Sequence, residues 1–314
     1  MAHPKEISAL NKAFTGLGVD EKTSISILTK WHPHQLHSYR KATPDFFIED
    51  ERQFERWSDP RVLQLRQEFI RFKDAVVLRT MHPWERDARL FKEALQMGPR
   101  IDIIIETACT RSSEDLLGAR RAYHSLFHRS IEEDIASQIH TSERKLLVAL
   151  VSAYRYEGPH VQEERAKSEA EVLYNAIKAV AKKNPTENEE VIMILATRSK
   201  SHIKAVYKYC EEISGNHLQQ DPDGDWALKQ TVQCLCTPHA YFSKILDASL
   251  RTDVDEAARD SVTRVILTRA DVDIKQIKEE FQHKFSGVSL SKRIEEVANG
   301  NYRDFLLALV SKEN

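Results

Sequence analysis

The chain has 314 residues, of which 46 are Lys or Arg and 48 are Asp or Glu, so its formal net charge at pH 7 is only −2. This balance excludes a general nucleic-acid-binding protein, which would carry a strong basic excess. With only 9 glycines and 10 prolines, the chain is also poor in the turn residues that a loop-rich all-β protein needs.

The predicted location is the cytoplasm, with any membrane contact peripheral. No uninterrupted apolar run exceeds six residues, the length of those at 146–151 and 191–196, which is far shorter than the roughly 20 residues of a membrane span. The first ten residues lack the charged-then-apolar layout of a signal sequence. Four cysteines form no CxxC pair, which is typical of a protein from a reducing compartment.

The first predicted feature is a turn between two helices, in residues 14–21. Gly16 and Gly18 stand two apart, which allows the backbone to turn sharply and to point its carbonyl groups outward. Asp20 is placed to cap the helix that follows. Outward carbonyls supply half of a calcium site, which a distant carboxylate can complete. The alternative interpretation is a plain helix–helix turn with a glycine cap.

Two patterns recur along the chain and indicate four repeats. An apolar run that ends in Thr-Arg and a small residue occurs at 108–112, 195–199 and 267–270, with a degenerate copy at 28–31. An amphipathic helix follows each copy, and a second apolar pattern closes each repeat. The predicted repeats are 1–80, 81–158, 168–240 and 241–314. We also predict an insertion near 45–60 in the first repeat and a polar linker, 157–167, between two halves.

Each repeat is predicted to contain four or five short helices. In the third, for example, apolar residues recur at helical spacing over 170–182, 191–196, 201–213 and 226–236. No convincing period-2 alternation, the mark of a half-buried strand, appears anywhere in the chain. The predicted fold class is all-α.

Four all-α units, of which the first keeps Gly-x-Gly followed by Asp-Glu, resemble the annexin family. Residues 81–87, 152–158 and 300–306 look like the plant branch of that family, and the resemblance covers essentially the whole chain. It implies a slightly curved disc of four repeats with about five helices each. It also implies that the convex face carries the calcium loops and meets the membrane, and that the protein takes part in stress responses.

The resemblance assigns one good calcium site, in the first repeat. The family's loop is Gly-x-Gly-Thr with an acidic residue further on; here Gly16 and Gly18 match, Val19 replaces Thr, and Glu68 matches the acidic residue across the insertion. By resemblance the carbonyls of Phe14, Gly16 and Gly18 and the Glu68 carboxylate bind Ca²⁺. Water or a lipid phosphate would complete the coordination, so the ion bridges the protein and an anionic phospholipid membrane. We expect Glu68 to lie outside any core.

The other three repeats depart from this pattern. Gln138 in the second and Val297 in the fourth stand where the carboxylate belongs. In the third, Pro185 interrupts the loop, although Asp225 stands near the acidic position. Acidic residues in the fourth repeat could bind calcium weakly, but a solvated helix start is the simpler interpretation; they are Asp253, Asp255 and Glu256.

Carried over by position, four residues would line the family's central hydrophilic channel: Asp87, Glu106, Arg111 and Arg269. Their functional interpretation is an ion path. The alternative, which we favour, is a set of interhelical ion pairs that orient the two halves.

Two further patterns could indicate an enzyme, and a third a redox role. His32, His34 and His37 lie where some plant annexins are credited with peroxidase activity; the alternative, which we favour, is a surface loop. Residues 221–224 resemble a nucleotide-binding element, but no phosphate loop accompanies them. Cys109 and Cys234 match a proposed redox pair, whose alternative is two buried core residues.

We therefore expect no committed catalytic site. The leading function is calcium-dependent binding to anionic phospholipid membranes. The alternatives are a peroxidase-like or nucleotide-hydrolysing enzyme and a calcium-independent membrane or protein scaffold. Further partners implied by the resemblance are a second copy of the chain on the membrane and the cytoskeleton, with no nucleic acid.

Overall fold

The computed structural model describes residues 3–42, 60–96, 98–178, 184–215, 225–251, 254–285 and 287–312. Over these ranges the chain forms 18 α-helices and one short 3-10 helix. The same ranges contain no β-strand, and their one β-type contact is an isolated parallel bridge between Leu17 and Ala298. The all-α prediction is confirmed. The insertion predicted near 45–60 lies almost wholly outside the described residues.

The chain divides into two compact units, of which unit 1 comprises residues 1–80 and 242–314 and unit 2 comprises residues 81–241. The first and fourth predicted repeats thus share one unit, and the second and third share the other. The polar segment 157–167 lies inside unit 2, so the expectation that it separates two halves of the molecule is wrong. The four repeat boundaries remain predictions.

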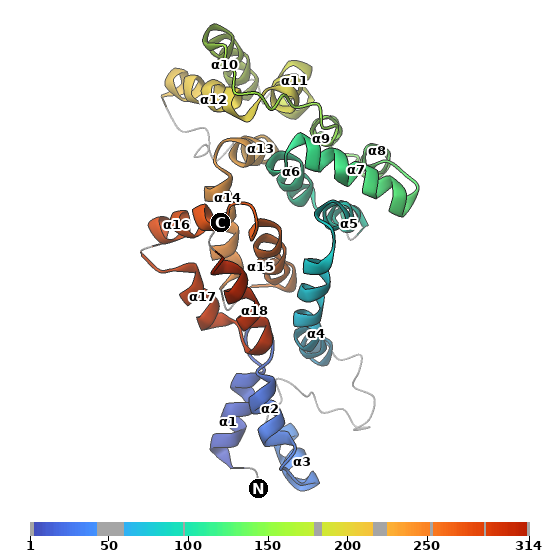
Figure 1. Ribbon diagram of the computed structural model, residues 1–314, viewed down its shortest axis with the longest axis vertical. Helices are drawn as coiled ribbons and strands as arrows, with labels where there is room; N and C mark the ends of the chain where they lie inside the picture. The colour runs from blue at the N-terminus through green and yellow to red at the C-terminus, as the bar shows by residue number, and fades with distance from the viewer. Residues whose placement is uncertain are drawn as a thin grey trace. The chain divides into compact units, whose positions relative to one another are not determined.

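Unit 1 comprises the N-terminal part of the chain, coloured blue in Figure 1, and the C-terminal part, coloured orange to red. Its N-terminal helices are α1 (Pro4–Ala13), α2 (Glu21–Leu28), α3 (Pro33–Ala42) and α4 (Pro60–Thr80). Its C-terminal helices are α15 (Glu256–Arg269), α16 (Ile274–Lys284), α17 (Leu290–Val297) and α18 (Gly300–Val310), while α14 (Pro238–Ser249) crosses the boundary between the units. Helix α4 packs on both α15 and α18, and α18 also contacts α2.

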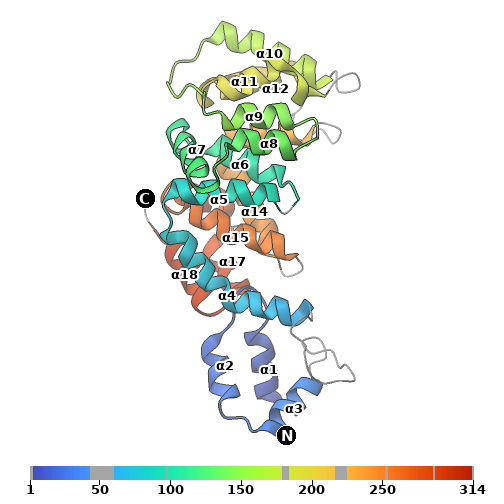
Figure 2. The same cartoon turned by 90° about the vertical axis from the view of Figure 1, so that its right-hand side faces the viewer.

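Unit 2 contains the helices from α5 to α13. They are α5 (Pro83–Gln96), α6 (Ile101–Thr110), α7 (Ser113–Phe127), α8 (Ile131–Gln138), α9 (Arg144–Val151), α10 (Glu163–Lys178), the 3-10 helix η1 (Pro185–Glu187), α11 (Glu189–Thr197), α12 (Lys200–Ser214) and α13 (Trp226–Cys236). Helices α10 and α12 lie side by side in both views (Figures 1 and 2), α5 packs on α7, and α6 packs on α13.

Side-chain caps fix where many of these helices begin. The Asp20 carboxylate accepts a hydrogen bond from the backbone N–H of Thr23 at 3.1 Å, as the sequence predicts for the start of α2. Ser130 and Glu133 form a full capping box at the start of α8. None of the helices in the described ranges is long and apolar enough to cross a bilayer.

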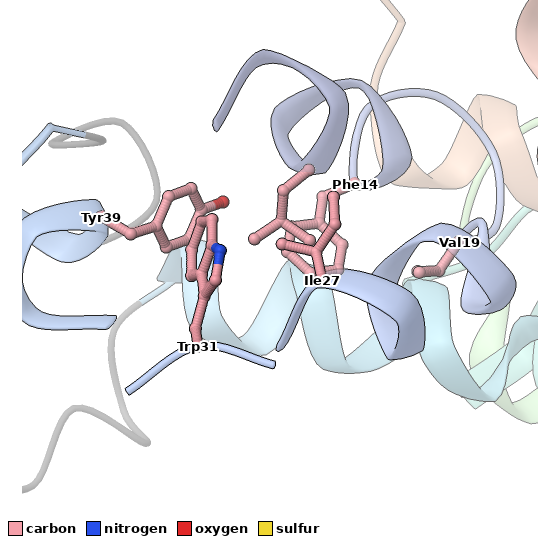
Figure 3. Packing of buried hydrophobic residues seen from close by; sticks show 6 residues of the cluster. Phe14, Val19, Ile27, Trp31 and Tyr39 are labelled. Atoms are coloured by element: carbon pink, nitrogen blue, oxygen red, sulfur yellow. The ribbon is translucent and has the colours of Figure 1, made fainter. Parts of the chain in front are cut away.

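A small apolar core holds the first three helices together and supports the glycine turn. It consists of Leu10, Phe14, Val19, Ile27, Trp31 and Tyr39, shown in Figure 3. The polar atoms of the two large aromatic residues are also satisfied: Trp31 Nε1 donates to Glu6 at 3.1 Å, and the Tyr39 hydroxyl donates to Asn11 at 3.0 Å. Since Phe14 and Val19 flank the turn in sequence, their burial anchors both of its ends.

Candidate functional site

The glycine turn between α1 and α2 adopts a conformation that glycine alone takes readily. Gly16 has φ of 95° and Gly18 has φ of 76°, both in the left-handed region. Between them, the Leu17 N–H donates to the carbonyl of Val297 at 2.8 Å, and the Asn299 N–H donates to the carbonyl of Leu17 at 2.7 Å. These two bonds fix the turn against the connection between α17 and α18.

The carbonyl groups of the turn divide into two sets. Those of Thr15 and Leu17 accept hydrogen bonds from the side chain and the backbone of Asn299, respectively. Those of Gly16 and Gly18 accept none from any residue that the structure describes. Two of the three carbonyls that the sequence analysis assigned to calcium therefore have no hydrogen-bond donor among the described residues, although Gly18 as a whole is buried; the third belongs to Phe14, at the end of α1.

Glu68 on α4 reaches the turn across the insertion, as the sequence analysis expected. Its Oε2 accepts a hydrogen bond from the Gly18 N–H at 2.6 Å and another from Arg71 Nε at 3.0 Å. Its Oε1 accepts from Arg71 Nη2 at 3.2 Å and from Arg259 Nη1 at 3.3 Å. A carboxylate has about four acceptor positions, and here all of them are filled.

The structure corrects the expectation that Glu68 lies outside any core. The residue is only 4% exposed, because α4 packs on α15 and α18. A buried carboxylate needs compensating partners, and the two arginines supply them.

Arg71 is the centre of a buried ion cluster that the sequence analysis missed. It is 6% exposed and pairs with Glu68, with Asp260 at 2.7 Å and with Glu256. Burial alone would lower the pKa of Arg71, but the hydrogen bond and the charge of Glu68 outweigh it and raise that pKa. We call these residues, with Arg259, the Arg71 cluster. The Glu68–Arg71 spacing (i, i+3) could have suggested one pair, but the partners on α15 could not be found from spacing.

The Arg71 cluster borders a pocket of about 530 Å³ beside the glycine turn. The pocket lining includes Lys12, Arg251 and Arg259. Helices α1, α14 and α17 all end next to lining residues, and helix C-termini favour positive charge. The pocket thus favours a cation, and the chain's own basic side chains already supply that charge.

The residues present fit a calcium ion in part. The Gly16 and Gly18 carbonyls are the neutral oxygen ligands that calcium accepts. The Glu68 carboxylate fits only when Arg71 and Arg259 release it, since its acceptor positions are filled. Within the described ranges, no group of three or more His, Cys, Asp or Glu side chains could hold a metal ion, so a site here depends on main-chain oxygens.

At the corresponding positions of the other repeats, the described residues have structural roles. Gln138 ends α8, and the Val297 carbonyl accepts the bond from Leu17. Asp225 caps α13 by accepting from the Leu228 N–H at 2.7 Å. Burial raises the pKa of the Asp225 carboxyl, and the charge of Glu143 adds to the effect.

In the fourth repeat, Asp255 caps α15 through the Ala258 N–H at 2.8 Å, and Glu256 pairs with Arg71. Asp253 lies outside the described residues. The interpretation as a solvated helix start therefore fits Asp255, whereas Glu256 is partly buried and belongs to the Arg71 cluster.

The four predicted channel residues are each paired within their own unit. In unit 2, Arg111 donates to both carboxylate oxygens of Asp87, at 2.6 and 2.8 Å, and Glu106 accepts from the Tyr241 hydroxyl at 3.2 Å. In unit 1, Arg269 donates twice to Asp273, at 2.7 and 2.6 Å. The Asp87–Arg111 and Arg269–Asp273 contacts are ion pairs within single units, and the Glu106–Tyr241 contact is a hydrogen bond. The ion path stays a prediction.

The four cysteines are buried and none forms a disulfide. Burial raises the pKa of Cys109 to about 11 and that of Cys236 to about 12, so both are protonated, weakly nucleophilic thiols at neutral pH. Cys109 and Cys234 lie on α6 and α13, which pack together. Their redox pairing remains a prediction.

The residues that suggested an enzyme are exposed or lie outside the described part of the chain. The rings of His32 and His34 are exposed and stacked, with centroids 6.1 Å apart. The His37 side chain and residues 221–224 lie outside the described residues.

Comparison with known proteins places this fold and turn in a family. The annexin family model matches residues 86–150 and 242–309. Annexin D4 of Arabidopsis thaliana is 49% identical over the full length of both chains. The annexin-like protein RJ4 of Fragaria ananassa is 38% identical, over 99% of this chain and 96% of its own. Chicken annexin V superposes with a TM-score of 0.69 at 26% identity, over 98% of this chain and 95% of that structure.

These similarities extend over the whole chain and agree with the predicted repeat fold. The family and the fold together indicate calcium-dependent binding to anionic phospholipid in general. With a full-length relative at 49% identity, the chain belongs to the annexin family.

Proposed function

We propose that this chain binds anionic phospholipid membranes in response to calcium, and that the glycine turn of unit 1 is its calcium loop. The observation that supports this most directly is the turn itself. The carbonyls of Gly16 and Gly18 accept no hydrogen bond from any described residue, while Glu68, 50 residues from Gly18 in sequence, lies within hydrogen-bond distance of the same loop. None of the other three predicted repeats keeps both a glycine loop and an acidic residue at the matching position.

The carbonyls of Gly16 and Gly18, and that of Phe14, would hold the ion together with Glu68 once the carboxylate is released. Bound calcium supplies positive charge and open coordination positions that suit a lipid phosphate oxygen. Arg71 keeps α4 joined to α15 through Asp260 and Glu256 whether or not Glu68 is released. We also propose a cytoplasmic protein that reaches the membrane when calcium rises and that has no enzymatic activity of its own.

The test is co-sedimentation with vesicles of phosphatidylserine and phosphatidylcholine, titrated with free calcium. Glu68→Gln keeps the shape of the side chain but removes its charge, so the calcium midpoint should rise by about tenfold. Asp225→Asn is the matched control, because this carboxylate caps a helix and lacks a glycine loop. Its midpoint should stay at the wild-type value.

Because Glu68 is buried and paired, melting temperatures without calcium must accompany the titration. Binding at the wild-type midpoint by a folded Glu68→Gln variant would mean that the first repeat is not the membrane anchor. Binding of the wild type to vesicles in the presence of a calcium chelator would instead support the calcium-independent scaffold.

A further inference from the structure

We propose that Arg71 and Arg259 set the calcium requirement of the first repeat, because their guanidinium groups and a calcium ion compete for the same Glu68 carboxylate. The inference rests on the proposed function, in that it takes the glycine turn as the calcium loop. It adds two residues that no feature of the loop itself would identify.

The acceptor positions of Glu68 are already occupied in the structure. Three of the four hydrogen bonds to Glu68 come from arginine: two from Arg71 and one from Arg259. The fourth comes from the Gly18 N–H at 2.6 Å. Charge-assisted bonds of this kind are about twice as strong as neutral ones, and in a site this buried they are weakly screened by salt. Calcium must therefore displace bound cations before it gains the carboxylate.

An exchange of arginine for calcium at Glu68 leaves Arg71 paired. When Glu68 turns away, the Arg71 guanidinium still contacts Asp260 at 2.7 Å and Glu256 on α15. The cost of leaving a buried charge without a partner is thereby avoided. Arg259 has Glu68 as its ion-pair partner, but its side chain lines the pocket and is 14% exposed. Water in the pocket can therefore solvate its guanidinium after release.

In the protein without calcium, the two arginines help to order the turn. Helix C-termini converge on the pocket and favour a cation there. With the two guanidinium groups in place, Glu68 can hold the Gly18 N–H and keep the turn ordered in the absence of metal. The same contacts that order the resting turn thus raise the calcium concentration needed to occupy it.

The experiment compares Arg259→Met with Arg251→Met. Both substitutions remove one positive charge from the pocket lining, but Arg251 pairs with Asp247 at 3.2 Å and does not contact Glu68. Calcium chloride alone is titrated into each full-length variant by calorimetry, and the vesicle midpoint is measured in parallel. We expect Arg259→Met to bind calcium about fivefold more tightly than the wild type, and Arg251→Met to change affinity by less than about twofold.

A second variant, Arg71→Lys, keeps a positive charge for Asp260 and Glu256 but cannot make two bonds to Glu68. It should melt at a lower temperature than the wild type without calcium and show a larger rise in melting temperature when calcium is added. Equal calcium affinities for the wild type, Arg259→Met and Arg71→Lys would overturn the inference, as would equal gains from Arg259→Met and Arg251→Met.

The Glu68→Gln titration distinguishes failure of the proposed calcium loop from failure of the competition. If Glu68→Gln leaves the calcium midpoint unchanged, the proposed loop itself is wrong. If it raises the midpoint while Arg259→Met and Arg71→Lys bind calcium as the wild type does, the loop stands and the competition is overturned.

Discussion

Gly16 meets two separate demands, one on backbone conformation and one on space. Its φ of 95° lies where side chains are rarely found, and a Cβ built on it would overlap the carbonyl oxygen of Val297. That carbonyl belongs to the bond that fixes Leu17, so it cannot retreat without loosening the turn. The proposed calcium loop and the packing of unit 1 therefore depend on the same residue.

Gly16→Ala should lower the free energy of unfolding by about 3 kcal/mol, the sum of a strained conformation and an overpacked contact. Gly287→Ala is the control within unit 1: its φ is 78°, but no described atom lies within 4 Å of a built Cβ, so only the conformational cost of about 1 kcal/mol applies. Urea denaturation of both variants measures the difference. Equal losses would show that contact with Val297 does not constrain the turn.

At the scale of elements, buried charges join helices in both units. In unit 2, Asp134 on α8 is fully buried and accepts hydrogen bonds from Tyr123 on α7 at 2.5 Å and from Lys92 on α5 at 2.9 Å. Burial alone would raise the pKa of Asp134, but these two bonds and the charges of Lys92 and Arg129 lower it below its usual value. One carboxylate thus connects three helices.

The lowered pKa of Asp134 determines how the stability that this residue contributes changes with pH. A carboxyl whose folded pKa is lowered contributes stability that is complete above its ordinary pKa of 3.8 and disappears as pH falls through the folded pKa. Asp134→Asn should therefore cost about 3 kcal/mol at pH 7 and progressively less below about pH 4. Asp102→Asn, at a half-exposed pair with Arg100, should cost little at either pH. A loss that is constant from pH 7 to pH 3 would contradict this role.

The helices themselves could be predicted from sequence, because their periodicity and caps are local. The cap at Asp20 and the glycine turn both follow from residues within one or two helical turns. The partners of Glu68 could not, since Arg259 lies 191 residues away and Arg71 meets Asp260 across 189 residues. A motif can place a carboxylate at a loop, but only the packed structure shows which other charges bind it.

At the scale of the whole molecule, the division into compact units could not be predicted from sequence either, because the units do not follow the order of the chain. Unit 1 joins the two ends, residues 1–80 and 242–314, whereas unit 2 is a single continuous segment. Sequence repeats reveal that similar units exist, but similar units can pair in several ways. The pairing depends on contacts such as those of Leu17 with Val297 and Asn299, which lie far apart in sequence.

This arrangement predicts how fragments of the chain behave. Residues 81–241 contain all the elements of unit 2 and should fold to a helical, cooperatively melting species. Residues 1–158, the first two predicted repeats, should not. The first repeat would lose the partners of its turn and of Arg71, which are Val297, Asn299, Glu256 and Asp260, leaving a buried cation and carboxylate incompletely paired.

Circular dichroism melts of the two fragments make the comparison, and adding residues 242–314 to residues 1–80 in trans should restore helix content in residues 1–80. A fragment 1–158 that melts as cooperatively as 81–241 would show that the first repeat folds without the fourth.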